Sequence, residues 1–211
     1  MFLIRTLSAQ PRLIALLSGF IFPFAIAPFF ISPLIILSLM GLLFSLKNSS
    51  AKEAALRTWL FGLGKFSVGV SWIYVSMHDH GGTPAIIAIL MVALFAAFLA
   101  TFPALFMYFF QRFYNQENTK VLISIFAFSA LWFSYEWFRS WFMTGFPWLF
   151  AGDAQLYTWL NGWAPILSVY GLSFFSALTA ATIYYAVRSK QTRYLIILII
   201  WPIGFALQNI S

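Results

Sequence analysis

Residues 136–155 read Glu-Trp-Phe-Arg-Ser-Trp-Phe-Met-Thr-Gly-Phe-Pro-Trp-Leu-Phe-Ala-Gly-Asp-Ala-Gln, and the rest of the chain is organised around this stretch. Its first part continues an apolar helical pattern in which Glu136 and Arg139 are three residues apart, so both charges lie on one helix face. Gly145 and Pro147 then predict the end of the helix. The stretch therefore predicts a charged helix face that leads into a broken, non-helical segment.

Aromatic residues occupy the broken segment at Phe146, Trp148 and Phe150. Aromatic rings with a polar edge are favoured at the boundary between membrane and water. Charged residues are costly to keep inside a membrane, so Glu136 and Arg139 are candidates for a functional site. The alternative, a structural ion pair beside an aromatic anchor belt, stays open on residue types alone.

The composition indicates an integral membrane protein. The 211 residues are 62% hydrophobic and only 8% charged, with a mean hydropathy of +0.89. A soluble domain carries about 25% charged residues, so this chain has too little polar surface to cover a globule in water. The net charge of +7 does not indicate nucleic-acid binding, because the basic residues lie in short runs between apolar segments. With no cysteine, the chain has no thiolate ligand and no cysteine nucleophile.

The apolar runs predict an all-α, polytopic bundle of seven transmembrane helices that forms a single domain over residues 1–211. The expected spans are residues 12–27, 34–46, 54–77, 84–110, 121–142, 163–187 and 194–207. Positively charged loops favour the cytoplasmic side. Basic residues fall at the ends that this rule makes cytoplasmic: Arg5, Arg12, Lys47, Lys52, Arg57, Arg112, Lys120, Arg188, Lys190 and Arg193. The pattern predicts a cytoplasmic N-terminus and an extracytoplasmic C-terminus.

The third expected span contains the intramembrane residue Lys65 and ends in the aromatic residues Trp72 and Tyr74. We expect Lys65 to snorkel to the surface or to have an internal partner, rather than to be catalytic. His78 and His80 flank an aspartate in the next loop, and these residue types can bind zinc or copper. Because the chain has no other histidine and no cysteine, we expect a solvated turn there and neither a metal nor a cofactor.

Two blocks of the sequence resemble the membrane part of bacterial apolipoprotein N-acyltransferases. The first is Gly-Val-Ser-Trp-Ile-Tyr-Val-Ser at residues 69–76, followed by Gly81-Gly82. The second is Glu136-Trp137-Phe138-Arg139, with Trp141, Thr144-Gly145-Phe146-Pro147-Trp148-Leu149, Gly162 and Ala164-Pro165-Ile166 after it. The similarity covers essentially the whole chain, and the order of the spans resembles the first seven of the family. Lys65, His78 and His80 depart from the pattern and receive no role from it.

The resemblance implies an acyltransferase of the bacterial inner membrane. Such enzymes transfer an acyl chain from a phospholipid to the N-terminal diacylglyceryl-cysteine of a lipoprotein, through a thioester on an extracytoplasmic nitrilase-like domain with a Glu-Lys-Cys triad. None of these catalytic residues can be placed here, so we expect the chain to supply lipid docking and to be inactive alone. The candidate lipid-binding residues are Trp148, Phe146, Arg139, Glu136, Trp72 and Tyr74.

A second interpretation is a non-enzymatic lipid-binding or scaffold protein that has kept a groove for acyl chains and has lost catalysis. A small transporter is disfavoured because the sequence has one broken aromatic segment and no internal repeat. A serine hydrolase is disfavoured because there is no Gly-x-Ser-x-Gly motif.

Overall fold

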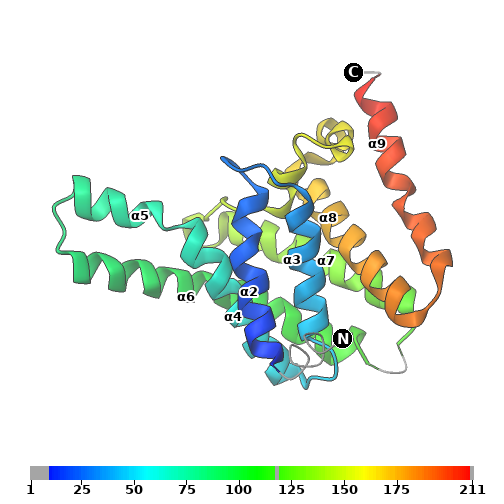
Figure 1. The fold of residues 1–211 in the computed structure, drawn as a ribbon, viewed down its shortest axis with the longest axis horizontal. Coiled ribbons are helices and arrows are strands. Elements are labelled where there is room, and N and C mark those ends of the chain that lie inside the picture. Colours follow the sequence, from blue (N-terminus) through cyan, green and yellow to red (C-terminus); the bar gives the residue numbers. More distant parts are fainter. Residues whose placement is uncertain (1–9, 117–118, 210–211) are drawn as a thin grey trace.

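A computed structural model describes residues 10–116 and 119–209, and within these ranges the chain is helical and contains no strand (Figure 1). The expected all-α class is thereby confirmed. The helices are α2 (Pro11–Ile21), α3 (Pro33–Ser45), α4 (Ala51–Gly69), α5 (Trp72–Val75), α6 (Ala85–Phe109), α7 (Val121–Trp141), α8 (Ala164–Ser189) and α9 (Ile200–Gln208). Short 3₁₀ or π segments extend or join them at Phe22–Ala25, Ser76–His80, Phe110–Tyr114, Phe142–Thr144, Ala151–Gln155, Trp159–Trp163 and Thr192–Ile199.

Three helical segments of the described chain are long and apolar enough to cross a membrane: Ala85–Tyr114, Val121–Thr144 and Trp159–Ser189. A fourth is possible if Ala51–Gly69 and Trp72–His80, which are bent by 47° relative to each other, form one span. Pro11–Ala25, Pro33–Ser45 and Thr192–Gln208 are apolar but shorter. The seven expected spans each overlap one of these segments, while the number of crossings and the sides of the termini stay predictions. Arg5 lies outside the described residues.

The third expected span is interrupted in the structure, whereas the sequence suggested one helix over residues 54–77. The helix α4 ends at Gly69, and α5 begins at Trp72 in a different direction. At Gly69, a Cβ atom would lie 2.2 Å from a methyl carbon of Leu149, so the loop that follows α7 packs directly against the end of α4. This contact joins the two sequence blocks that flank the candidate site.

The core of the bundle forms where α4 packs against α2 and α6, and where α7 and α3 pack against α8. The contact between α4 and α6 is close because Gly62 faces Ala100, where an added Cβ would lie 2.7 Å from that residue. The indole Nε1 of Trp59 also donates to the carbonyl oxygen of Ala97 at 3.1 Å. Small side chains thus bring these two helices together, as expected for helices packed in a membrane.

The segment formed by α5, its π turn and the N-terminal half of α6 projects away from the bundle (Figure 1). Large apolar side chains are exposed along this half of α6 at Ile86, Ile87, Ile89, Leu90, Met91 and Leu94. Such a surface is stable where hydrocarbon rather than water surrounds it. On the other side of the molecule, α9 stands apart from α2 and α3 and contacts the Trp159–Trp163 turn (Figure 1).

Candidate lipid-binding site and its buried support

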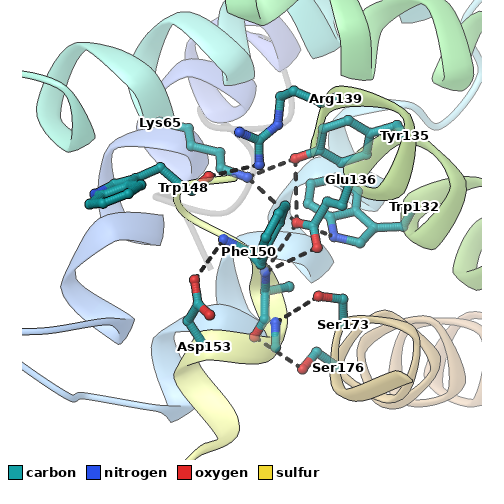
Figure 2. A network of polar contacts seen from close by, with 12 residues as sticks. Lys65, Trp132, Tyr135, Glu136, Arg139, Trp148, Phe150, Asp153, Ser173 and Ser176 are labelled. Atoms are coloured by element: carbon teal, nitrogen blue, oxygen red, sulfur yellow. Dashed lines mark hydrogen bonds and ion pairs between the residues drawn. The ribbon is translucent and has the colours of Figure 1, made fainter. Parts of the chain in front are cut away.

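The C-terminal end of α7 places an ionic cluster inside the bundle (Figure 2). Glu136 and Arg139 share the inward face of the helix, as their spacing predicts, and both are fully buried. Two buried aromatic residues lie on the same face of α7. Trp132 is one turn before Glu136 in the helix, and Tyr135 directly precedes Glu136. A buried charge is tolerated only when it is paired and hydrogen-bonded, so the partners of these two side chains determine what the cluster does.

The carboxylate of Glu136 joins α7 to the loop that follows it. Its Oε1 atom accepts from the indole Nε1 of Trp132 at 3.1 Å and from the backbone N–H of Ala151 at 3.0 Å. Its Oε2 atom lies 3.3 Å from the same N–H. The Tyr135 hydroxyl is 3.5 Å from Oε1. Glu136 therefore fixes the position of residue 151 relative to the helix.

Lys65 of α4 supplies the opposite charge. Its Nζ atom donates to the Tyr135 hydroxyl at 2.7 Å and lies 3.7 Å from Oε1 of Glu136. The ammonium group also lies 3.8 Å from the ring centroid of Phe22, a favourable cation–π distance. The side chain is fully buried. Of the two expected environments for Lys65, the internal partner is the one found and snorkelling is wrong, because these neighbours satisfy the charge inside the bundle.

Arg139 binds the backbone of the same loop. Its guanidinium group donates to the carbonyl oxygens of Phe146 and Trp148, the second through Nη2 at 2.7 Å. The backbone N–H of Phe146 returns a hydrogen bond of 2.9 Å to the Arg139 carbonyl oxygen. The sequence-based expectation that Arg139 and Glu136 contact lipid directly is not met in this structure, because both side chains are buried and hydrogen-bonded to the loop.

The loop between residues 142 and 150 has an unusual backbone. Met143, Thr144 and Leu149 have φ angles of 50°, 73° and 61°, a region that side chains other than glycine adopt at a cost. Gly145, with φ of 82°, approaches the Ser140 carbonyl so closely that an added Cβ would lie 2.0 Å from its oxygen. The hydrogen bonds to Arg139 and Glu136 stabilise this strained path.

The next turn, Ala151–Gln155, is fixed by α8 and by its own aspartate. The Gly152 N–H donates to Oγ of Ser173 at 2.8 Å, and Oγ of Ser176 donates to the Ala151 carbonyl oxygen at 3.4 Å. Asp153 accepts from the Phe150 N–H at 2.9 Å. Burial raises the pKa of Asp153 to about 6, although that hydrogen bond acts in the opposite direction.

A groove of about 570 Å³ lies beside this fixed loop. Its walls are the turn after α2, the end of α4 with the start of α5, and the loop after α7, through Pro23, Phe24, Ile26, Ala27, Pro28, Phe29, Val68, Gly69, Ser71, Trp72, Pro147, Trp148, Leu149 and Asp153. Trp148 is 53% exposed and lies 6.3 Å from Trp72 between ring centroids. In Figure 2 the Trp148 indole points away from the ionic cluster, while its carbonyl oxygen faces Arg139.

The six residues expected to bind lipid thus divide into three positions. Trp148 and Trp72 line the groove, and Phe146 lies next to them, half-buried, with its ring centroid 6.3 Å from Trp148 and 5.2 Å from Phe95 of α6. Glu136 and Arg139 lie underneath, in the ionic cluster. Tyr74 lies on the projecting segment, where its ring is 5.3 Å from that of His78. The structure therefore brings five of them to one place and leaves Tyr74 apart.

Tyr135, Asp153 and Ser173 belong to the site but were not singled out from the sequence. Tyr135 directly precedes Glu136, and Asp153 lies within the stretch quoted first, so their positions carried a weak signal. Ser173 is one of several serines in apolar helices, and no spacing distinguishes it.

The His-Asp-His segment forms a local turn on the projecting segment. Nδ1 of His78 is 2.8 Å from the Thr83 carbonyl oxygen, and its Nε2 atom is 4.0 Å from the Asp79 carboxylate. Within the residues described, no group of three side chains of the metal-binding types converges.

The chain is similar in sequence to proteins of one known family. Residues 18–182 match the sequence model of the apolipoprotein N-acyltransferase N-terminal domain. The chain is 38% identical over 204 residues to the apolipoprotein N-acyltransferase of Pseudomonas syringae pv. tomato, covering 94% of this chain and 40% of that protein. It is 44% identical over 170 residues to that of Pseudomonas aeruginosa LESB58, with coverage of 81% and 33%. It is 40% identical over 184 residues to that of Coxiella burnetii, with coverage of 84% and 36%.

The chain therefore spans 33–40% of the length of these relatives. The match contains α3 to α7 and most of α8, and with them the ionic cluster and the loop that carries Trp148. On this evidence the chain belongs to the apolipoprotein N-acyltransferase family and corresponds to its N-terminal domain.

Proposed function

We propose that this chain is the membrane module of an apolipoprotein N-acyltransferase of the bacterial inner membrane. In this proposal the enzyme transfers an acyl chain from a phospholipid to the N-terminal diacylglyceryl-cysteine of a lipoprotein. The chain docks the lipid substrates, and a nitrilase-like domain with a Glu-Lys-Cys triad supplies the chemistry. The observation that carries the proposal is the apolar groove at Trp148 and Trp72, beside a loop fixed by buried charges.

The physical properties of the groove support lipid as its ligand. Both substrates are diacyl lipids, whose tails must stay in hydrocarbon while their head groups reach a reactive thiol above the bilayer. Trp148 and Trp72 offer large apolar faces with a polar edge, which suits the depth at which tails meet head groups. The buried cluster fixes the Trp148 backbone, so the indole is held in place before the lipid arrives. Glu136 and Arg139 are positioning residues in this scheme, while Trp148, Phe146 and Trp72 contact the substrate.

The proposal includes the seven-span topology, with the N-terminus in the cytoplasm and the C-terminus outside. The distribution of lysine and arginine supports it. Because α7 would then run outward, the Trp148 groove would face the extracytoplasmic leaflet. The exposed apolar side chains on α6 are consistent with a lipid surrounding.

We predict that the 211-residue chain transfers no acyl group by itself, because it contains no cysteine to form the thioester. The test is to reconstitute the purified chain in phospholipid vesicles with a diacylglyceryl-cysteine peptide and to measure N-acylated peptide by mass spectrometry. A fusion of the chain to the remaining part of the Pseudomonas syringae relative should form product under the same conditions.

The intact Pseudomonas syringae protein serves as the positive control for that assay. Product formed by the isolated chain would refute the division between docking and chemistry. A well-folded fusion that forms no product, beside an active control, would favour a non-enzymatic lipid-binding protein.

A further inference from the structure

A second groove lies between α3 and α8, at the end of the bundle opposite the Trp148 loop. Its volume is about 470 Å³. It is lined by Met40, Gly41, Phe44, Lys47, Tyr184, Val187 and Arg188. The walls are therefore apolar along the helices. The two basic side chains, Lys47 and Arg188, line the groove near the C-terminal ends of α3 and α8. Neither the ionic cluster nor the proposed acyl transfer uses these residues.

Among the described residues, no acidic side chain pairs with the two basic residues of this groove. Lys47 and Arg188 are exposed, and within the described part of the chain neither forms an ion pair. Glu53 is the acidic residue at this end among those described. It is already engaged by Arg12 at 2.9 Å and by Arg57 at 2.9 Å. As far as the described residues go, the positive charge at the groove is not neutralised by an acidic side chain and can attract an anion from outside the protein.

A buried hydroxyl provides an independent indication of a ligand. Tyr184 lines the groove and is only 8% exposed. The guanidinium of Arg188 can only donate to its hydroxyl oxygen, so the hydroxyl proton has no acceptor among the residues described. Its charged neighbour is Arg188. An unsatisfied buried hydroxyl costs about 1–3 kcal/mol, so such a group next to a cation is explained if an acceptor on a ligand completes it.

We propose that this groove binds one anionic phospholipid. Its phosphate lies between Lys47 and Arg188 and accepts a hydrogen bond from the Tyr184 hydroxyl. An acyl chain runs along the apolar wall formed by Met40 and Phe44. Paired basic side chains above an apolar channel between membrane helices match the charge and the shape of such a lipid. In the topology proposed above the lipid comes from the cytoplasmic leaflet, whereas the acyl donor binds at the other end.

The test uses native mass spectrometry of the purified full-length chain, titrated with phosphatidylglycerol and, separately, with phosphatidylcholine. We expect the chain to bind one phosphatidylglycerol in preference to phosphatidylcholine. The double variant Lys47→Gln/Arg188→Gln should weaken phosphatidylglycerol binding by about twentyfold, since each basic residue near a membrane surface contributes a factor of about five. The matched control is Lys52→Gln/Lys190→Gln, which removes the same charge at exposed positions that do not line the groove.

Tyr184→Phe separates a binding role from a structural one. Without lipid its melting temperature should equal or exceed that of the wild type, because the variant removes an unsatisfied hydroxyl. Its phosphatidylglycerol affinity should nevertheless fall about fivefold. Equal losses in the two double variants, or no preference for phosphatidylglycerol over phosphatidylcholine, would overturn the proposal. Neither readout depends on acyl transfer, so failure here leaves the proposed function untouched.

Discussion

Replacement of Glu136 by alanine is expected to destabilise the bundle by about 3–5 kcal/mol, the usual cost of removing one partner from a buried ion pair. The variant would leave the Lys65 ammonium in a fully buried position without its counter-charge. It would also leave the Ala151 N–H and the Trp132 indole N–H without their acceptor. The loss is measured as the change in unfolding free energy in a denaturant titration of detergent-solubilised protein.

Two further variants distinguish the charge from the packing. Glu136→Gln keeps an oxygen acceptor for the Ala151 N–H but removes the charge, so its destabilisation should be smaller than that of alanine. Adding Lys65→Met to Glu136→Gln should recover part of the lost stability, because no unpaired ammonium remains. An alanine variant as stable as the wild type would show that the cluster does not support the fold.

Replacement of Arg139 by leucine is expected to release the loop that carries Trp148. The carbonyl oxygens of Phe146 and Trp148 would both lose their donor inside the protein, at about 1–3 kcal/mol for each. The strained backbone at Met143 and Thr144 would then lose part of its support, although the bond from the Phe146 N–H to the backbone carbonyl of residue 139 and the bonds of Glu136 to Ala151 would remain. Hydrogen exchange at residues 145–149 should accelerate by at least about tenfold, while exchange within α8 should change much less.

Arg139→Lys is the informative companion to the leucine variant. Lysine keeps the positive charge but has no planar fork, so it cannot bind both carbonyl oxygens in the same geometry. We expect intermediate exchange rates in the loop. Wild-type exchange in the leucine variant would mean that the loop is held by packing alone, and the role assigned to Arg139 would be wrong.

The sequence predicted the local parts of this site and not the contacts between distant segments. The spacing of Glu136 and Arg139 placed both on one helix face, and Gly145 with Pro147 placed the helix break, because each feature depends on neighbouring residues. Lys65 was recognised as a buried or snorkelling charge, but its hydrogen-bond partner is Tyr135, 70 residues away. No periodicity within α4 contains that information.

A contact between distant segments also explains why the break in the third expected span was not predicted. Residues 54–77 read as one helix because Gly69 and Ser71 do not by themselves end a helix in an apolar segment. The break occurs where Leu149, from a loop far along the chain, packs against Gly69. It also explains why Arg139 was expected to contact lipid: its position near the end of α7 suggested exposure, but the returning loop covers it.

The central claim is that Trp148 contacts the phospholipid at a groove set up by the buried cluster. Its most direct test compares Trp148→Ala with Trp159→Ala in the fusion to the remaining part of the Pseudomonas syringae relative, with phospholipid as the varied substrate. Trp159 is 54% exposed, almost the same as Trp148, but it contacts Phe205 and does not line the groove. The two variants should have similar melting temperatures. We predict that Trp148→Ala lowers kcat/KM for phospholipid by about tenfold or more, mainly through KM, and that Trp159→Ala changes it by less than about twofold. Equal values for the two variants would contradict the account.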